Sequence, residues 1–193
     1  MILTLLLTLF ATDQEAGIDQ PSPEAASPSP FGWDLGGSTA GLTCPKVLDV
    51  YQCVAAPSPV GGFDLYLLLD IGGFVGEIRG IGTAYENDAH GYKVRARFGE
   101  LRTALVEKYG DPSSDYDFLA AGSIWDDPQY WAIGILKGER FLASFWIDDD
   151  DVAITLTAAA LSSSMTYLTL SYQDNDLIDS RNAAAAQQDA GGL

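Results

Sequence analysis

Only one stretch of this sequence has the apolar spacing of a long α-helix, and it divides two groups of strand-like segments. In residues 92–109 large side chains recur at intervals of three and four, along one stripe of a helix: Val94, Phe98, Leu101, Leu105 and Tyr109. Gly110 and Pro112 then follow as stop signals. Gly99 inside the helix suggests that another element packs closely there.

Apolar runs predict strands on both sides of this helix. The clearest four are residues 63–71, 74–82, 152–159 and 165–172. Gly72 and Gly73 permit a tight reversal between the first two, and a serine-rich turn separates the last two. Two shorter runs, residues 31–35 and 47–54, are also strand-like.

Residues 129–147 predict a β-hairpin, because two apolar runs flank Gly138-Glu139, which suits a two-residue turn. The register that follows pairs Leu136 with Phe141, Ile133 with Ser144 and Trp131 with Trp146. Both faces of this hairpin are apolar, so it is expected at the centre of its sheet. The expected fold class is α+β: an antiparallel sheet, with a meander in the C-terminal half, and one main amphipathic helix packed on it.

Composition divides the chain into four segments. Residues 1–16 predict a signal peptide, because their apolar run would reach only about 15 Å as a helix, too short to cross a bilayer. Residues 17–30 are a Pro/Ser-rich linker, residues 31–178 a single α+β domain and residues 179–193 an Ala-rich flexible tail. We expect a periplasmic or secreted protein that is not integral to a membrane. A cytoplasmic location is the alternative, since no Lys or Arg precedes the apolar run.

The two cysteines, Cys44 and Cys53, fit an exported domain with one disulfide. In one continuous strand their Cα atoms would lie about 30 Å apart, far beyond bridging distance. A disulfide therefore requires a turn between them, and two free thiols are the alternative.

The charge of the chain is strongly negative. With 27 acidic and 10 basic side chains the net charge is -17, which opposes docking on a phosphate backbone. Nucleic acid is therefore not an expected partner. The expected partner is an unknown protein or small molecule.

Basic side chains concentrate on the predicted helix, at Lys93, Arg95, Arg97, Arg102 and Lys108. This cluster can serve as a patch for an anionic ligand or an acidic partner. The alternative is the solvated face of an amphipathic helix whose cations pair with nearby carboxylates.

A second candidate patch combines an aromatic side chain with acids, at Trp125, Asp126 and Asp127. Two carboxylates facing each other across a cleft would suit a hydrolase, whereas the same residues also suit a turn beside core aromatics. No catalytic residue can be assigned from this pattern alone.

Four consecutive aspartates, Asp148, Asp149, Asp150 and Asp151, are the candidate metal ligands. Neighbouring side chains in extended backbone diverge, whereas calcium needs six to eight converging oxygens, so a solvated bend is preferred. His90 is the only histidine, which excludes a histidine-rich metal site. No cofactor is expected.

Three segments, KYGDP, GSIWDDPQYW and YLTLSYQD, resemble a loose group of small uncharacterised exported bacterial proteins. The resemblance covers residues 46 to 175 and implies a bacterial source, but no activity. Residues 74–82 lack a cysteine that the resemblance implies there.

These observations favour a non-enzymatic binding or interaction module of the cell envelope. Two alternatives stay open: a cell-envelope hydrolase that uses paired carboxylates near Trp125, and an acidic inhibitor or immunity-type protein.

Overall fold

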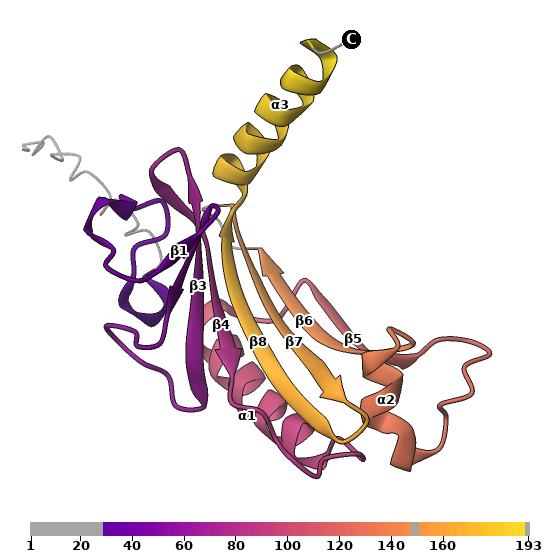
Figure 1. Cartoon of the computed structure of the whole chain (residues 1–193). Coiled ribbons are helices and arrows are strands. Elements are labelled where there is room, and N and C mark those ends of the chain that lie inside the picture. Colours follow the sequence, from indigo (N-terminus) through magenta and orange to yellow (C-terminus); the bar gives the residue numbers. More distant parts are fainter. Residues whose placement is uncertain (1–28, 148–150, 192–193) are drawn as a thin grey trace, which may run out of the picture.

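Eight antiparallel strands form one sheet, and helices complete an α+β architecture (Figure 1). This computed structural model describes residues 29–147 and 151–191. The strands lie in the order β1-β2-β3-β4-β8-β7-β6-β5. Their bounds are β1 Lys46–Val47, β2 Val50–Cys53, β3 Phe63–Ile71, β4 Phe74–Gly82, β5 Ser114–Leu119, β6 Arg140–Ile147, β7 Val152–Ser162 and β8 Met165–Asp174. The predicted α+β class and antiparallel sheet are confirmed.

Two predicted hairpins form the middle of the sheet. β3 and β4 reverse at Gly72-Gly73, and β7 and β8 reverse after Ser162. The hairpins join where β4 pairs with β8, from Glu77 opposite Gln173 to Ile81 opposite Thr169. Strands from distant parts of the sequence thus become neighbours at the centre.

One face of the sheet carries the hydrophobic core. A row of cross-strand partners on this face runs from β3 to β6 through Leu68, Ile78, Tyr172, Ile154 and Trp146. Each of these side chains is buried. Alternate residues of the same strands point to the opposite face, as strand geometry requires.

Helix α1, Tyr92–Tyr109, crosses the core face (Figure 1). Its bounds are those of the predicted helix, and Val94, Phe98, Leu101 and Leu105 are buried. The carboxylate of Asp88 accepts hydrogen bonds from the backbone of Lys93 and Val94 and so satisfies two donors of the first turn. No atom of another element lies within 4 Å of the position that a Cβ on Gly99 would take, so the prediction of a closely packed neighbour there is wrong.

The hairpin predicted for residues 129–147 is wrong in its first half. Residues 131–136 form helix α2, Trp131–Leu136, after a 3₁₀ turn, η3, at Pro128–Tyr130. Trp131 is buried against Gly91, which anchors α2 beside the start of α1. Gly138, with φ +68°, ends the helix instead of turning a hairpin. β6 pairs instead with β5 and β7, so it lies next to the edge and not at the centre.

The strands expected near the N-terminus also differ. Residues 31–35 form no strand, because a 3₁₀ turn, η1, occupies Pro30–Gly32. A second 3₁₀ turn, η2, follows at Thr39–Gly41. The run at 47–54 breaks at Leu48, where φ is +54°, and becomes the short hairpin β1–β2.

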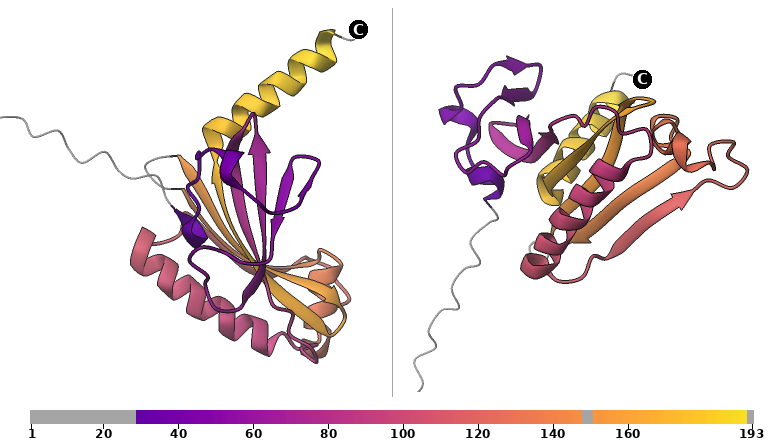
Figure 2. Two further views of the ribbon diagram at one scale, coloured as in Figure 1. Left: turned by 60° about the vertical axis from the view of Figure 1, so that its left-hand side comes forward. Right: turned by 90° about the horizontal axis from the view of Figure 1, so that it is seen from below.

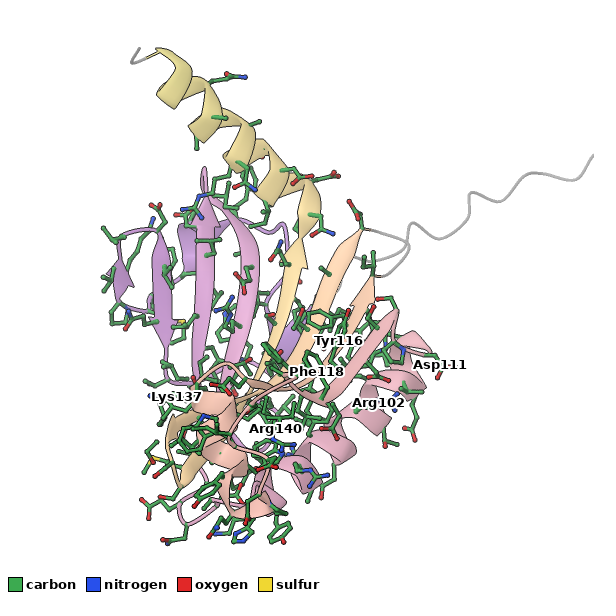
Figure 3. The ribbon with its side chains drawn as sticks, turned by 90° about the vertical axis from the view of Figure 1, so that its right-hand side faces the viewer. Arg102, Asp111, Tyr116, Phe118, Lys137 and Arg140 are labelled. Atoms are coloured by element: carbon green, nitrogen blue, oxygen red, sulfur yellow. A yellow bond between two sulfur atoms is a disulfide. The ribbon has the colours of Figure 1, made fainter. Side chains whose placement is uncertain are left out.

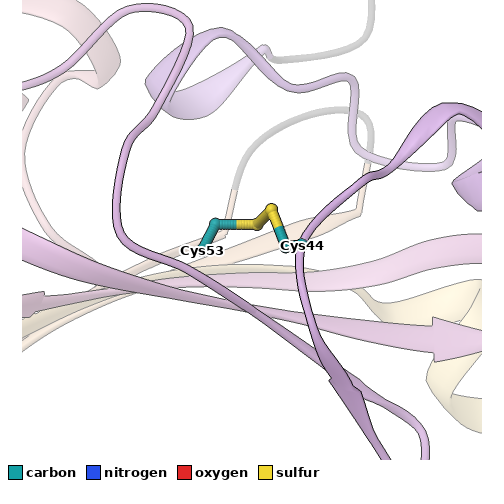
Figure 4. Close-up of a disulfide and its surroundings, with 2 residues drawn as sticks. All are labelled: Cys44 and Cys53. Carbon is teal, nitrogen blue, oxygen red and sulfur yellow. A yellow bond between two sulfur atoms is a disulfide. The ribbon is translucent and has the colours of Figure 1, made fainter.

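Cys44 and Cys53 form a disulfide, with their Cα atoms 5.1 Å apart (Figure 4). The β1–β2 reversal lies between them and supplies the turn that such a bond requires. Cys53 is buried in the core, so the bond ties the segment before β1 to the covered face of the sheet.

Helix α3, Asn175–Gly191, follows β8 and extends away from the sheet (Figures 1 and 2). Asp174 accepts a hydrogen bond from the backbone of Leu177, and the alanine-rich sequence favours a helix. The residues expected to form a flexible tail are therefore helical as far as Gly191. Within the described ranges, no helix combines the length and hydropathy that a membrane span requires.

Candidate functional site

Four aromatic side chains gather on the face of β5 and β6 that α1 does not cover, and we call them the aromatic cluster: Tyr116, Phe118, Phe141 and Phe145. Phe118 and Phe141 are direct cross-strand partners, with ring centroids 5.0 Å apart. Tyr116 meets Phe145 and Phe118 edge to face, at 5.8 and 6.1 Å. The rings enclose a shallow hollow of about 220 Å³.

The aromatic cluster is open to solvent because its neighbours on the same face are small or polar. Tyr116, Phe118 and Phe141 are 45%, 44% and 43% exposed. Beyond Phe145 the same row of the sheet continues through Thr155 and Ser171, which cannot cover a phenyl ring. In Figure 3 Tyr116 and Phe118 lie over this open face, whereas Arg102 lies on α1.

The opposite side of β5 is acidic. Asp115 and Asp117 alternate with the aromatic residues and face α1. Asp115 accepts hydrogen bonds from the guanidinium of Arg102 and, at 2.5 Å, from the hydroxyl of the fully buried Ser144. The hydrogen bonds from Arg102 lower the pKa of Asp115 below its ordinary value, although partial burial acts in the opposite direction.

The ion pair between Arg102 and Asp115 helps to position β5. β5 is the last strand of the sheet, and no described strand pairs with its outer edge. Arg102 links it to α1, and Ser144 links it to β6, so the edge is held from two sides. A fixed edge strand with aromatic rings on one face and carboxylates on the other is an arrangement suited to binding.

Of the five basic side chains predicted as a patch on the helix, Lys93, Arg97 and Arg102 make polar contacts with described residues. Arg97 pairs with Glu100 and donates to the carbonyl of Gly61, and Arg102 pairs with Asp115. Lys93 donates to the carbonyl of Glu86. These contacts match the alternative of a helix face whose cations have internal partners. Among the described residues, Arg95 and Lys108 form no ion pair.

Trp125, Asp126 and Asp127 lie in the segment that leads into α2. Trp125 is half-buried and meets Tyr130 edge to face at 5.7 Å. Asp127 caps η3 by accepting a hydrogen bond from the backbone of Gln129, and Asp126 is exposed. The three residues thus form a capped turn beside an aromatic pair.

Of the four candidate metal ligands, Asp148, Asp149 and Asp150 lie outside the described residues. Asp151 is exposed, has φ +58° and accepts a hydrogen bond from the Asn175 amide at 3.1 Å. Across residues 29–147 and 151–191, no three side chains of the metal-binding types come together.

The aromatic cluster was not predicted, although its pattern is present in the sequence. Residues 115–118 read DYDF, an alternation of acidic and aromatic residues. The hairpin interpretation gives β6 a different partner, so it leaves this segment without a place in the sheet. Comparison of the chain with protein-family models, with curated proteins and with solved structures gives no match.

Proposed function

We propose that this chain is a non-enzymatic binding domain of the bacterial cell envelope that captures an extended segment of a partner protein along β5. The observation that carries the proposal is the aromatic cluster beside an unpaired strand edge. Contiguous exposed aromatic side chains on a soluble domain mark interaction sites, and an exposed edge accepts an added strand through backbone hydrogen bonds.

The alternation along β5 defines the chemistry of the partner. An antiparallel strand added to the edge places its side chains next to those of β5 on each face. On the open face they meet Tyr116 and Phe118, and on the other face they meet Asp117, which forms no ion pair with a described residue. The preferred segment therefore alternates apolar or aromatic residues with Lys or Arg.

Net charge favours a different protein over a second copy. Each copy carries a charge of -17, so two copies repel each other, whereas a basic partner is attracted. In this proposal α1 is the main amphipathic helix, which supports the sheet from behind and leaves the open face free.

Three features support an exported location. Residues 1–16 have the proportions of a signal peptide, and residues 17–30 those of a tether. The Cys44–Cys53 disulfide is of the kind that persists in oxidising compartments.

Selection of peptides from a random library on the immobilised full chain tests the proposal. Enriched peptides are expected to alternate apolar with basic residues. For such a peptide, Phe118→Ser should weaken binding by about tenfold or more, because an aromatic anchor is lost. Asp117→Asn should weaken it by about threefold, since one partly exposed ion pair is lost.

The matched control is Phe74→Ser, which removes an aromatic side chain of similar exposure, 49%, from the start of the distant strand β4. It should leave binding unchanged. Peptides without the alternation, or with equal affinity for the wild type and Phe118→Ser, would contradict the proposal.

A further inference from the structure

A second hollow lies on the covered face of the sheet, between two separate covers. Leu101, Leu105 and Lys108 of α1 form one wall, and the segment around Phe31 forms the other. Leu170 and Tyr172 of β8 form the floor. Its volume of about 310 Å³ is at the lower end of the range for small-molecule sites. This cleft is separate from the aromatic cluster, which lies on the opposite face.

The two ends of the cleft differ in chemistry. Phe31, Leu101 and Leu170 make its body apolar, which suits a hydrocarbon. At the C-terminal end of α1, Lys108, Tyr109 and Tyr172 come together: the ammonium of Lys108 lies 4.8 Å from the ring centre of Tyr109, and the two tyrosine rings are 6.2 Å apart.

The polar end combines a cation that has no ion pair among the described residues with two neighbouring phenols. The hydroxyl of Tyr109 is buried close to that of Tyr172, but it makes no hydrogen bond of regular geometry with a described residue. Lys108 forms no ion pair with any described residue, in a protein where carboxylates are abundant. Burial, together with the neighbouring Tyr109, raises the pKa of Tyr172, so its hydroxyl stays a donor at neutral pH.

We propose that this cleft binds a single-chain amphiphile with a carboxylate head, of the class of medium-chain fatty acids. The chain occupies the apolar body, and the head meets the ammonium of Lys108 and the hydroxyl of Tyr172, two residues that line the cleft. A charge-assisted hydrogen bond from Lys108 gives the preference for an anion over a neutral alcohol. The small volume selects one acyl chain and excludes a two-chain lipid.

Calorimetric titration of the full chain with decanoate, and with decanol as the neutral analogue, tests the proposal. Decanoate is expected to bind more tightly than decanol. Lys108→Gln should weaken decanoate binding by about tenfold and leave decanol unaffected. The matched charge control is Lys137→Gln, an exposed lysine at the end of α2, which should change neither affinity.

Blocking the cleft gives an independent measurement. Ala104 is exposed on the cleft side of α1, so Ala104→Trp should fill the opening and abolish binding of both ligands. Ser58→Trp does the same from the opposite wall. Ala96→Trp, on an exposed position of the same helix away from the cleft, should have no effect.

Absence of decanoate binding by the wild type, or equal loss in Ala104→Trp and Ala96→Trp, would overturn the cleft as the site. Binding of both ligands with equal affinity, unchanged by Lys108→Gln, would overturn the recognition of the carboxylate. Peptide binding along β5 does not depend on either result, because the two sites lie on opposite faces.

Discussion

At the scale of single residues, the carboxylate of Asp88 organises the start of α1. It is 3% exposed and accepts three hydrogen bonds, two from the backbone of the helix and one, at 2.7 Å, from Thr166 of β8. The residue at the N-cap position itself is Gly91, which has no side chain to offer. Asp88 therefore caps the helix from an unusual distance and also joins it to the sheet.

Two glycines of the same region should respond in opposite ways to replacement by alanine. Gly91 has φ +68°, and an added Cβ would lie 2.2 Å from the Trp131 ring. Gly91→Ala should therefore lower the free energy of unfolding by about 2 to 4 kcal/mol. Gly99, in the interior of α1, has open space around it, so Gly99→Ala should raise that free energy by up to about 1 kcal/mol.

Chemical denaturation of the two variants beside the wild type measures both effects. Gly99→Ala is the control for the helix, since it makes the same chemical change without a clash. Equal stability of Gly91→Ala and the wild type would mean that Trp131 does not pack against the start of α1.

At the scale of elements, the Arg102–Asp115 ion pair links β5 to α1, in addition to the pairing of β5 with β6. Arg102→Gln should lower the free energy of unfolding at pH 7 by about 0.5 to 1 kcal/mol, the usual value for a partly exposed pair. Arg95→Gln is the matched control, because Arg95 is on the same helix, is exposed and has no ion pair with a described residue. It should have little effect.

The contribution of the Arg102–Asp115 pair to the free energy of unfolding should depend on pH. The pKa of Asp115 is lower in the folded protein than in the unfolded chain, so the folded state binds fewer protons. The contribution of the pair is complete above the ordinary aspartate pKa and is lost as the pH falls through the lowered value. Unfolding curves should therefore show the difference between the wild type and Arg102→Gln shrink below about pH 4. A difference that stays constant into acid would contradict this.

Elements with strong local patterns could be predicted from the sequence. The spacing of Val94, Phe98 and Leu101 and the stop at Gly110 define α1, and glycines or serines define the reversals of the two central hairpins. α2 could not be predicted, because its short apolar run fits a strand as well as a helix. The choice between strand and helix depends on a contact between Trp131 and Gly91, which are distant in sequence.

The candidate site could not be predicted from the sequence either, because it also depends on contacts between residues that are distant in sequence. The alternation of residues 115–118 identifies two faces of a strand, but only the position of α1 determines which face is open. The basic residues of the helix can be identified from the sequence. Their partners, such as Asp115 for Arg102, can be identified only from the fold.

At the scale of the whole molecule, the sheet has one covered face and one open face. α1 and the N-terminal segment share the covered face, and the aromatic cluster lies on the open one. The Cys44–Cys53 disulfide adds a covalent cross-link between the segment before β1 and strand β2 of the sheet.

Removal of that link should weaken the whole domain. Replacement of both cysteines by serine should lower the free energy of unfolding by about 2 to 3 kcal/mol, the value expected for so short a loop. Denaturant titration of the wild type with a thiol reductant should give a similar loss, and the reductant should not affect the double variant. A double variant as stable as the oxidised wild type would contradict this prediction.

The pairing of β4 with β8 has a consequence for how the molecule is made. β4 leaves the ribosome early, but its central neighbour, β8, is the last of the described strands to be synthesised. Until then β4 has one unsatisfied edge, and the sheet stays divided. Pairing between such distant segments slows folding, so the sheet should reach its final form only after β8 has been synthesised.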